Sequence, residues 1–178
     1  MQKEKTDKVL YDENRKIQFD FSKVINVFEP HELASMYSEY LSDVDFVVED
    51  CEKLYCVEYK NANIEGAVNP QALTDKLNTD TFWCKIAKKF YGTMFLVWAC
   101  DKNTEDKPVQ YVLIMETNPN MDLALKKRFM LKMQSRLPYK FIGKEDIRRH
   151  VIDDEFLILD IKEWNEKFEK YPISYLQI

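Results

Sequence analysis

Glycine, histidine and paired cysteines are scarce in this chain of 178 residues. It has 3 Gly and 2 His, and none of its 4 cysteines belongs to a CxxC pair. A structural zinc site needs four soft ligands at close spacing, so the sequence argues against a zinc-stabilised fold. With so little glycine, turns must use Asn, Asp and Pro. We expect the cysteines to be reduced, buried, small apolar residues: Cys51, Cys56, Cys84 and Cys100.

The chain also lacks a long hydrophobic run. Its longest strongly apolar stretch, Met94 to Cys100, is far too short to cross a bilayer. The N-terminal sequence MQKEKTDKVL is charged throughout and has no apolar segment typical of a signal peptide. We therefore expect a cytoplasmic protein with no membrane partner. Residues 1–8 are polar, and we expect them to lack a fixed structure.

A large excess of positive charge is absent as well. The net charge is −5 and the pI about 5.2, which argues against a protein that coats nucleic acid nonspecifically. It does not exclude an enzyme with a local basic patch. The composition, 46% hydrophobic and 32% charged, is ordinary for a folded protein. The length predicts one domain over residues 1–178, because domains commonly have about 100–200 residues.

Apolar runs and helical periodicities alternate along the chain, which predicts an α/β fold with a mixed sheet covered by helices. We expect the second helix to be interrupted near residues 78–79 and to end at Tyr91-Gly92. The run at 93–100 is continuously apolar, as in a strand buried on both faces. The expected strands are within 16–28 and at 44–49, 54–60, 93–100, 109–116 and 156–161; the expected helices are 30–41, 70–91, 121–136 and 162–170.

The strongest hairpin signal joins strands 44–49 and 54–60 through the polar turn at 50–53. A four-residue turn would pair Glu49 with Leu54. Counting back along both strands then pairs Val47 with Cys56, Asp45 with Glu58 and Asp43 with Lys60. One face of the hairpin would gather these last four residues. The other face would carry core side chains: Phe46, Val48, Tyr55, Val57 and Tyr59.

Opposed carboxylates such as Asp45 and Glu58 repel each other unless a cation lies between them. Mg²⁺ suits such a pair, because it binds one or two carboxylates and completes its coordination with water and phosphate oxygens. Lys60, two residues after Glu58, shares its strand face and could orient a metal-bound water or offset phosphate charge. These groups are those needed to hydrolyse a phosphodiester.

At these residues the sequence resembles the PD-(D/E)XK nuclease superfamily, with Val44-Asp45 in place of Pro-Asp and Glu58-Tyr59-Lys60 as the ExK motif. The surrounding order is also similar: helix, strand with Asp, strand with ExK, helix, strand. The resemblance implies a restriction-endonuclease-like fold that cleaves DNA with Mg²⁺ or Mn²⁺ and uses no organic cofactor. By it, Asp45, Glu58 and the Tyr59 carbonyl would bind the metal, and Lys60 would position the attacking water.

Other residues are open candidates for supporting roles. Some relatives add a glutamate from the preceding helix, and the sequence does not choose between Glu32 and Glu39. Others carry a Gln or Lys in the helix after ExK, where Gln71, Lys76 or Lys85 could serve. Asp43 rivals Asp45 as the first ligand. Residues that could contact phosphates form two basic groups on predicted helices: Lys85 and Lys89, then Arg128, Lys132 and Arg136.

Simpler interpretations compete with each assignment. Glu58 and Lys60 could belong to a solvent-exposed strand face, with Lys60 paired to Asp43, and the basic helix residues could be a solvated surface. Three functions therefore remain open: a metal-dependent nuclease, a catalytically inactive nuclease-like module that binds nucleic acid or protein, and an unrelated α/β interaction protein. Whether the chain forms a homodimer also stays open.

Overall fold

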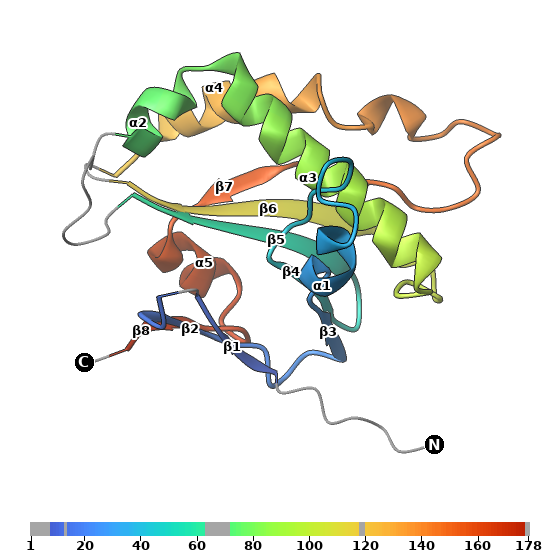
Figure 1. The fold of residues 1–178 in the computed structure, drawn as a ribbon, viewed down its shortest axis with the longest axis horizontal. Helices are drawn as coiled ribbons and strands as arrows, with labels where there is room; N and C mark the ends of the chain where they lie inside the picture. Colours follow the sequence, from blue (N-terminus) through green and yellow to red (C-terminus); the bar gives the residue numbers. More distant parts are fainter. Residues whose placement is uncertain (1–7, 13, 63–71, 118–119, 177–178) are drawn as a thin grey trace.

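The computed structural model describes residues 8–12, 14–62, 72–117 and 120–176. This part of the chain contains five α-helices and two β-sheets, of five and three strands, in a mixed α/β arrangement as predicted. Three helices cover one face of the five-stranded sheet, and the smaller sheet and the last helix cover the other (Figure 1). Buried side chains form two core clusters, one on each face of the five-stranded sheet.

The larger sheet has the strand order β3 (Asn26–Phe28), β4 (Phe46–Glu49), β5 (Leu54–Asn61), β6 (Val109–Glu116) and β7 (Leu157–Leu159). The first three strands are antiparallel neighbours, whereas β5, β6 and β7 are parallel. The predicted hairpin register is confirmed within the paired residues, with Glu49 opposite Leu54 and Val47 opposite Cys56. β5 is the central strand, and its neighbour β6 is buried at every residue.

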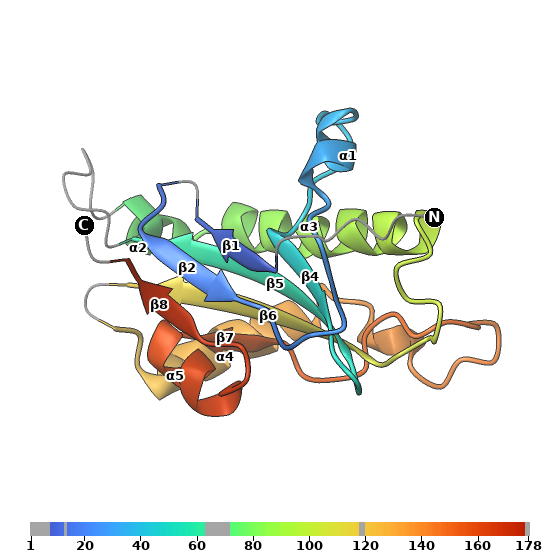
Figure 2. The same ribbon diagram turned by 90° about the horizontal axis from the view of Figure 1, so that it is seen from below.

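The smaller sheet joins the two ends of the described chain. It consists of β1 (Val9–Tyr11), β2 (Ile17–Asp20) and β8 (Ile173–Tyr175), all antiparallel (Figure 2). The sequence predicted a strand around β2 but neither β1 nor β8. Residues 1–7 lie outside the described part, but Lys8 is not frayed, because its Nζ donates hydrogen bonds to the carbonyls of Val24 and Ile25.

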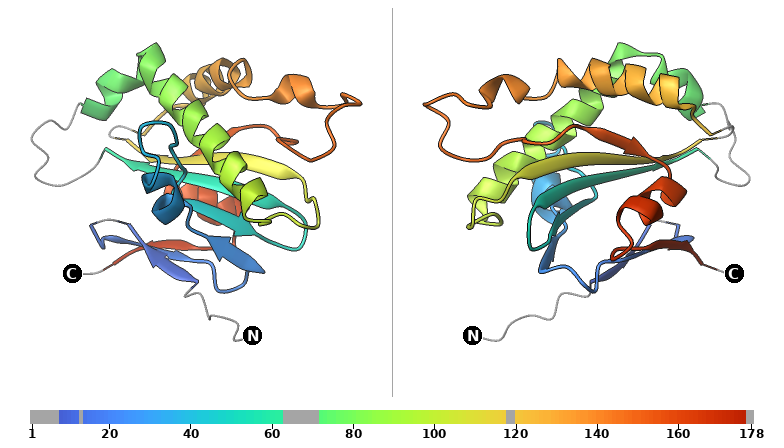
Figure 3. Two further views of the ribbon diagram at one scale, coloured as in Figure 1. Left: turned by 45° about the vertical axis from the view of Figure 1, so that its right-hand side comes forward. Right: turned by 180° about the vertical axis from the view of Figure 1, so that it is seen from behind.

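The helices on the first face are α2 (Ala72–Leu77), α3 (Asp80–Ala99) and α4 (Leu123–Gln134), and α5 (Ile161–Lys167) lies on the second face (Figure 3). The predicted interruption at 78–79 is confirmed, because Thr79 caps α3 by accepting a hydrogen bond from Phe82 N–H. α4 begins two residues after the predicted start at 121, because Asp122 caps it by accepting a hydrogen bond from Leu125 N–H.

The helix predicted at 30–41 is much shorter in the structure. α1 spans only His31–Ser35, and turns follow it up to Tyr40. The apolar residues that suggested a longer helix, Met36, Tyr37 and Tyr40, are exposed, so no core contact rewards further helical turns.

The cysteine and membrane expectations can also be compared with the structure. All four cysteines are free thiols, but only Cys56 is buried, and Cys51 and Cys84 are exposed. The expectation that the cysteines are buried apolar residues was therefore wrong for these two. Among the described residues, no helix combines the length and apolarity that crossing a membrane requires.

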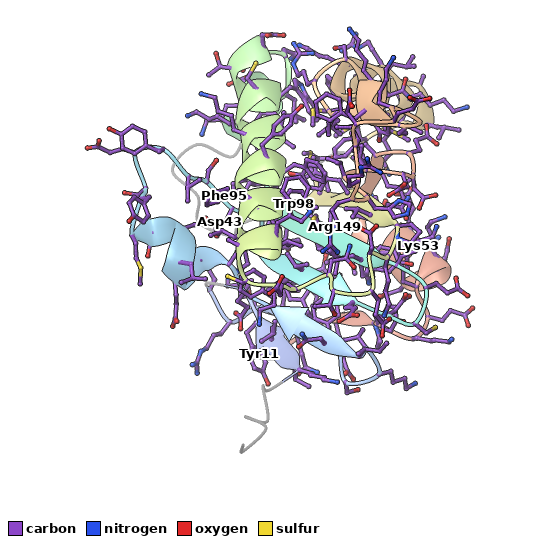
Figure 4. All side chains as sticks on the ribbon, turned by 90° about the vertical axis from the view of Figure 1, so that its right-hand side faces the viewer. Tyr11, Asp43, Lys53, Phe95, Trp98 and Arg149 are labelled. Atoms are coloured by element: carbon purple, nitrogen blue, oxygen red, sulfur yellow. The ribbon has the colours of Figure 1, made fainter. Side chains whose placement is uncertain are left out.

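The strand predicted at 93–100 was wrong, because Thr93 to Ala99 form the last turns of α3. Met94 and Val97 are buried, whereas Phe95 and Trp98 are 56% and 43% exposed on the helix surface (Figure 4). Because the exposed face of this helix carries aromatic residues, the sequence of an amphipathic helix resembles a continuous apolar run. A short apolar run does not by itself distinguish a buried strand from a helix.

Gly92 does not end the helix, as the sequence suggested, but allows another segment to approach it closely. A Cβ atom at this position would lie 2.1 Å from the backbone oxygen of Ser42. The chain between α1 and β4 therefore lies directly against the middle of α3. In the same segment, Val44 N–H donates a 2.9 Å hydrogen bond to Thr93 Oγ1.

Gly92→Ala should destabilise the protein, although alanine has the higher helix propensity by about 1 kcal/mol. The new methyl group would meet backbone atoms that cannot rotate away. We expect a net loss of about 1–3 kcal/mol in the free energy of unfolding, measured by chemical denaturation. Lys88→Ala, an exposed change on the same helix, is the control. Unchanged stability of Gly92→Ala would show that Ser42 does not pack as described.

Candidate functional site

The candidate site lies at the N-terminal end of β4. Asp45 lies immediately before β4, and its Oδ2 accepts a 2.7 Å hydrogen bond from the backbone N–H of Tyr59 on β5. In a continued antiparallel ladder, this N–H would be bonded to a backbone carbonyl of the partner strand. The Asp45 side chain takes that role, which fixes its carboxylate beside β5.

Glu58 is the most unusual residue of β5, because its charged side chain is 0% exposed. Two ammonium groups contact its carboxylate. Lys60 Nζ lies 2.6 Å from Oε1, and Lys89 Nζ on α3 lies 2.9 Å from Oε1 and 3.0 Å from Oε2. The side chains of these lysines are 34% and 25% exposed, so the site connects a buried anion to the surface.

The environment of Glu58 shifts the pKa of its carboxyl group upward. Burial raises the pKa of Glu58 above its ordinary value, and the negative charge of Asp45 raises it further. The ammonium groups of Lys60 and Lys89 act in the opposite direction. Asp45 and Glu58 are therefore close enough to interact, as expected for two carboxylates at opposed positions.

A pocket of about 350 Å³ opens beside this pair. Asp45 and Lys60 line it, whereas Glu58 is buried and does not. The aromatic lining residues Phe19, Phe46 and Tyr59 belong to the core cluster on the side of the smaller sheet. Asp43, which lies beside the middle of α3 in Figure 4, also lines the pocket and contacts His31 Nδ1 at 3.3 Å. The other ionisable acidic side chains of the pocket are Asp12 and Glu29. Carboxylates thus outnumber cationic groups, and the pocket would repel a phosphate unless a cation were bound.

The structure brings the predicted residues Asp45, Glu58 and Lys60 together, but it changes the surroundings. The alternative of a solvent-exposed face was wrong for Glu58, which is fully buried. Asp43 contacts His31, and Lys60 forms its ion pair with Glu58. The side chain of Tyr59 packs in the opposite core, 5.4 Å from the ring of Phe19.

Most of the proposed supporting residues do not reach the pair. Glu32 and Glu39 are exposed, as are Lys76 and Lys85, and Gln71 lies outside the described residues. Sequence reasoning missed Lys89 as a partner of Glu58. The available signal was the expected Gln or Lys in the helix after ExK, but the candidates were Gln71, Lys76 and Lys85. Lys89, one helical turn after Lys85, was expected only to contact phosphates. Because α3 continues to Ala99, its middle rather than its end lies over β5.

The second predicted basic group has structural partners. Lys132 Nζ lies 3.1 Å from Asp80 Oδ1, and Arg136 also forms an ion pair with Asp80. Their hydrogen bonds hold the pKa of Asp80 at about 2, below its usual range. The Arg128 guanidinium lies 5.2 Å from the centre of the Phe129 ring. Lys132 and Arg136 therefore join α4 to the start of α3, which favours the solvated-surface interpretation of this group.

The carboxylate oxygens of the site are the type of ligand that a hard divalent cation prefers. Among the described residues, no three His, Cys, Asp or Glu side chains gather closely enough to form a metal-binding group. Mg²⁺ needs fewer protein ligands, since one or two carboxylates suffice when water and phosphate oxygens complete its coordination. Asp45 and Glu58 supply two carboxylates, and the contacts of Glu58 are already cationic.

Comparisons of the chain with protein-family models, with curated proteins and with solved structures found no match. The functional assignment therefore depends on the residues of the site itself.

Asp45→Asn should lower the pKa of Glu58, because it removes a neighbouring negative charge and keeps an oxygen that can accept the Tyr59 N–H bond. In the wild type, the raised pKa of Glu58 makes stability fall as the pH rises above 4.5 through the folded-state pKa. Asp45→Asn should reduce that fall. Carbon-13 NMR titration of the Glu58 carboxyl group and denaturation at several pH values measure both effects.

The matched control for this experiment is the same substitution in a Glu58→Gln background. Because the glutamine in this background cannot ionise, Asp45→Asn should no longer change the pH dependence of stability through residue 58. A Glu58 pKa that is the same in the wild type and in Asp45→Asn would contradict the electrostatic coupling.

Proposed function

We propose that the protein is a metal-dependent phosphodiesterase that cleaves DNA, with Asp45, Glu58 and Lys60 at its active site. The observation that carries this proposal is the burial of Glu58 next to a second carboxylate and in contact with two ammonium groups. A buried charge is costly, and strongly perturbed groups beside a pocket are typical of functional sites. A purely structural role would not need a second carboxylate here.

The order of secondary structure supports the restriction-endonuclease-like part of the proposal. α1 precedes β4, Asp45 lies at the start of β4, the Glu58-Tyr59-Lys60 motif lies on β5, and α3 leads to β6. This is the order that the resemblance to PD-(D/E)XK nucleases implies. The differences are the short α1 and the position of Asp45 just before the strand rather than within it.

Asp45 and Glu58 are the side chains that would hold Mg²⁺ or Mn²⁺, together with the backbone carbonyl of Tyr59. When bound, such an ion supplies a Lewis acid and an activated water. Lys60 lies in contact with Glu58 and lines the pocket, so its ammonium group can orient a water molecule and offset phosphate charge. The acidic lining also explains why the anionic substrate would require a cation.

A non-catalytic role as a nucleic-acid- or protein-binding module is the second candidate. Two observations favour it: the net charge is −5, and Lys132 and Arg136 are already paired with Asp80. A module of this kind would bind a partner without a requirement for Glu58 or a divalent ion. Binding without cleavage, unaffected by Glu58→Ala, would therefore support it.

Cleavage should require Mg²⁺ or Mn²⁺ and should be abolished by Glu58→Ala, which removes a metal ligand. Lys60→Ala should retain metal binding but slow the chemical step by about 100-fold or more, because a positioned charge at the reacting phosphate is lost. The measurement is a cleavage assay on single- and double-stranded DNA and on RNA, paired with calorimetric metal titration.

Lys88→Ala, which removes an exposed charge from α3, is the control and should cleave like the wild type. Both site variants should remain folded, because Glu58→Ala removes the buried charge itself and Lys60→Ala leaves Lys89 in contact with Glu58. Cleavage that survives Glu58→Ala would place the chemistry elsewhere, and a wild type that neither binds a divalent ion nor cuts would refute the proposal.

A further inference from the structure

Lys89 is placed differently from Lys60 in the candidate site. Lys60 is on the same strand as Glu58, two residues away, and its ammonium group contacts one carboxylate oxygen. Lys89 comes from α3, 31 residues along the chain, and its ammonium group is within 3.0 Å of both oxygens. A single cationic group thus bridges the whole Glu58 carboxylate from the helix side.

A divalent cation would need the oxygens that Lys89 now contacts. Mg²⁺ binds carboxylate oxygens directly at about 2.0–2.1 Å and tolerates little distortion of its coordination. An ammonium group in contact with the same oxygen would repel the ion strongly at such a short distance. Both cations cannot hold Glu58 in this arrangement at the same time.

Lys89 can leave without unfolding the helix. Its side chain is 25% exposed, so part of it already reaches solvent, and four flexible methylene groups separate the charge from the backbone. Without the metal, the same side chain shares with Lys60 the neutralisation of a carboxylate that is fully buried. Lys89 can therefore stabilise Glu58 when no metal is bound and leave it when a metal ion binds.

We propose that Lys89 is a resident counter-ion of Glu58 that a divalent cation displaces, so that Lys89 lowers and sets the metal affinity of the site. This inference rests on the proposed function, because it takes Glu58 as a metal ligand. It assigns to Lys89 a positioning and regulating role rather than contact with the reacting atoms.

Calorimetric titration with MnCl₂ and MgCl₂ tests the inference on the full chain. Lys89→Met keeps much of the side chain's bulk and removes its charge. It should bind either ion about tenfold more tightly than the wild type, because the ammonium group that contacts both oxygens of Glu58 is gone and only Lys60 still contacts one of them. Lys85→Met, one helical turn away and exposed, should leave the affinity unchanged. Glu58→Gln should abolish metal binding both in the wild type and in Lys89→Met.

A second measurement needs no substitution of Lys89. Brief acetylation of the wild type with an amine-reactive reagent, followed by mass spectrometry, reports how free the Lys89 ammonium group is. Saturating Mn²⁺ should increase acetylation of Lys89 severalfold and leave that of Lys85 unchanged. If Lys89→Met fails to fold, this result alone decides.

The outcomes separate this inference from the proposed function. If the wild type binds metal through Glu58, but Lys89→Met binds no more tightly or metal leaves Lys89 acetylation unchanged, the displacement mechanism is refuted and the metal site stands. If the wild type binds no divalent ion at all, both are refuted. Tighter binding by Lys89→Met together with metal-induced exposure of Lys89 would establish the mechanism.

Discussion

The central constraint in this structure is the charge on Glu58, which lies inside the protein in the middle of the core strand β5. A carboxylate removed from water is costly unless cationic partners reach it. Lys60 supplies one partner from the same strand, but the second, Lys89, can only come from the layer above. The packing of α3 on β5 therefore stabilises the Glu58 charge as well as the hydrophobic core.

Close packing around α3 links this charge cluster to the rest of the site. The absence of a side chain at Gly92 lets Ser42 approach the helix, and Thr93 accepts the next hydrogen bond from Val44. Asp45 follows directly and is fixed from the other side by Tyr59. α3 therefore places the Lys89 ammonium group against Glu58, and it also positions the backbone segment that carries Asp45.

The sequence predicted the parts of this arrangement that depend on local patterns. The hairpin was predictable because a polar turn separates two alternating strands, and its register then placed Asp45 opposite Glu58. The break before α3 was predictable because Asn78 and Thr79 favour a cap over helix continuation. Local signals of this kind involve only neighbouring residues, so they persist whatever the tertiary structure.

The missed features depend on contacts between distant segments. Phe95 and Trp98 would be expected in a core, and their exposure on α3 depends on how the helix lies against the rest of the protein. Gly92 looked like a helix end because its partner, Ser42, is 50 residues away. Lys89 differs from Lys85 by one turn, and the choice between them requires the position of the helix over β5.

The acidic pocket and the two lysines have a common physical basis. Asp12, Glu29, Asp43 and Asp45 line a space that a phosphate could enter only against repulsion, whereas the buried Glu58 holds two ammonium groups in contact. Lys89 contacts Glu58 from α3 and does not line the pocket, whereas Lys60 both lines the pocket and contacts Glu58. The ammonium group of Lys60 therefore places a positive charge between the acidic lining of the pocket and the buried carboxylate.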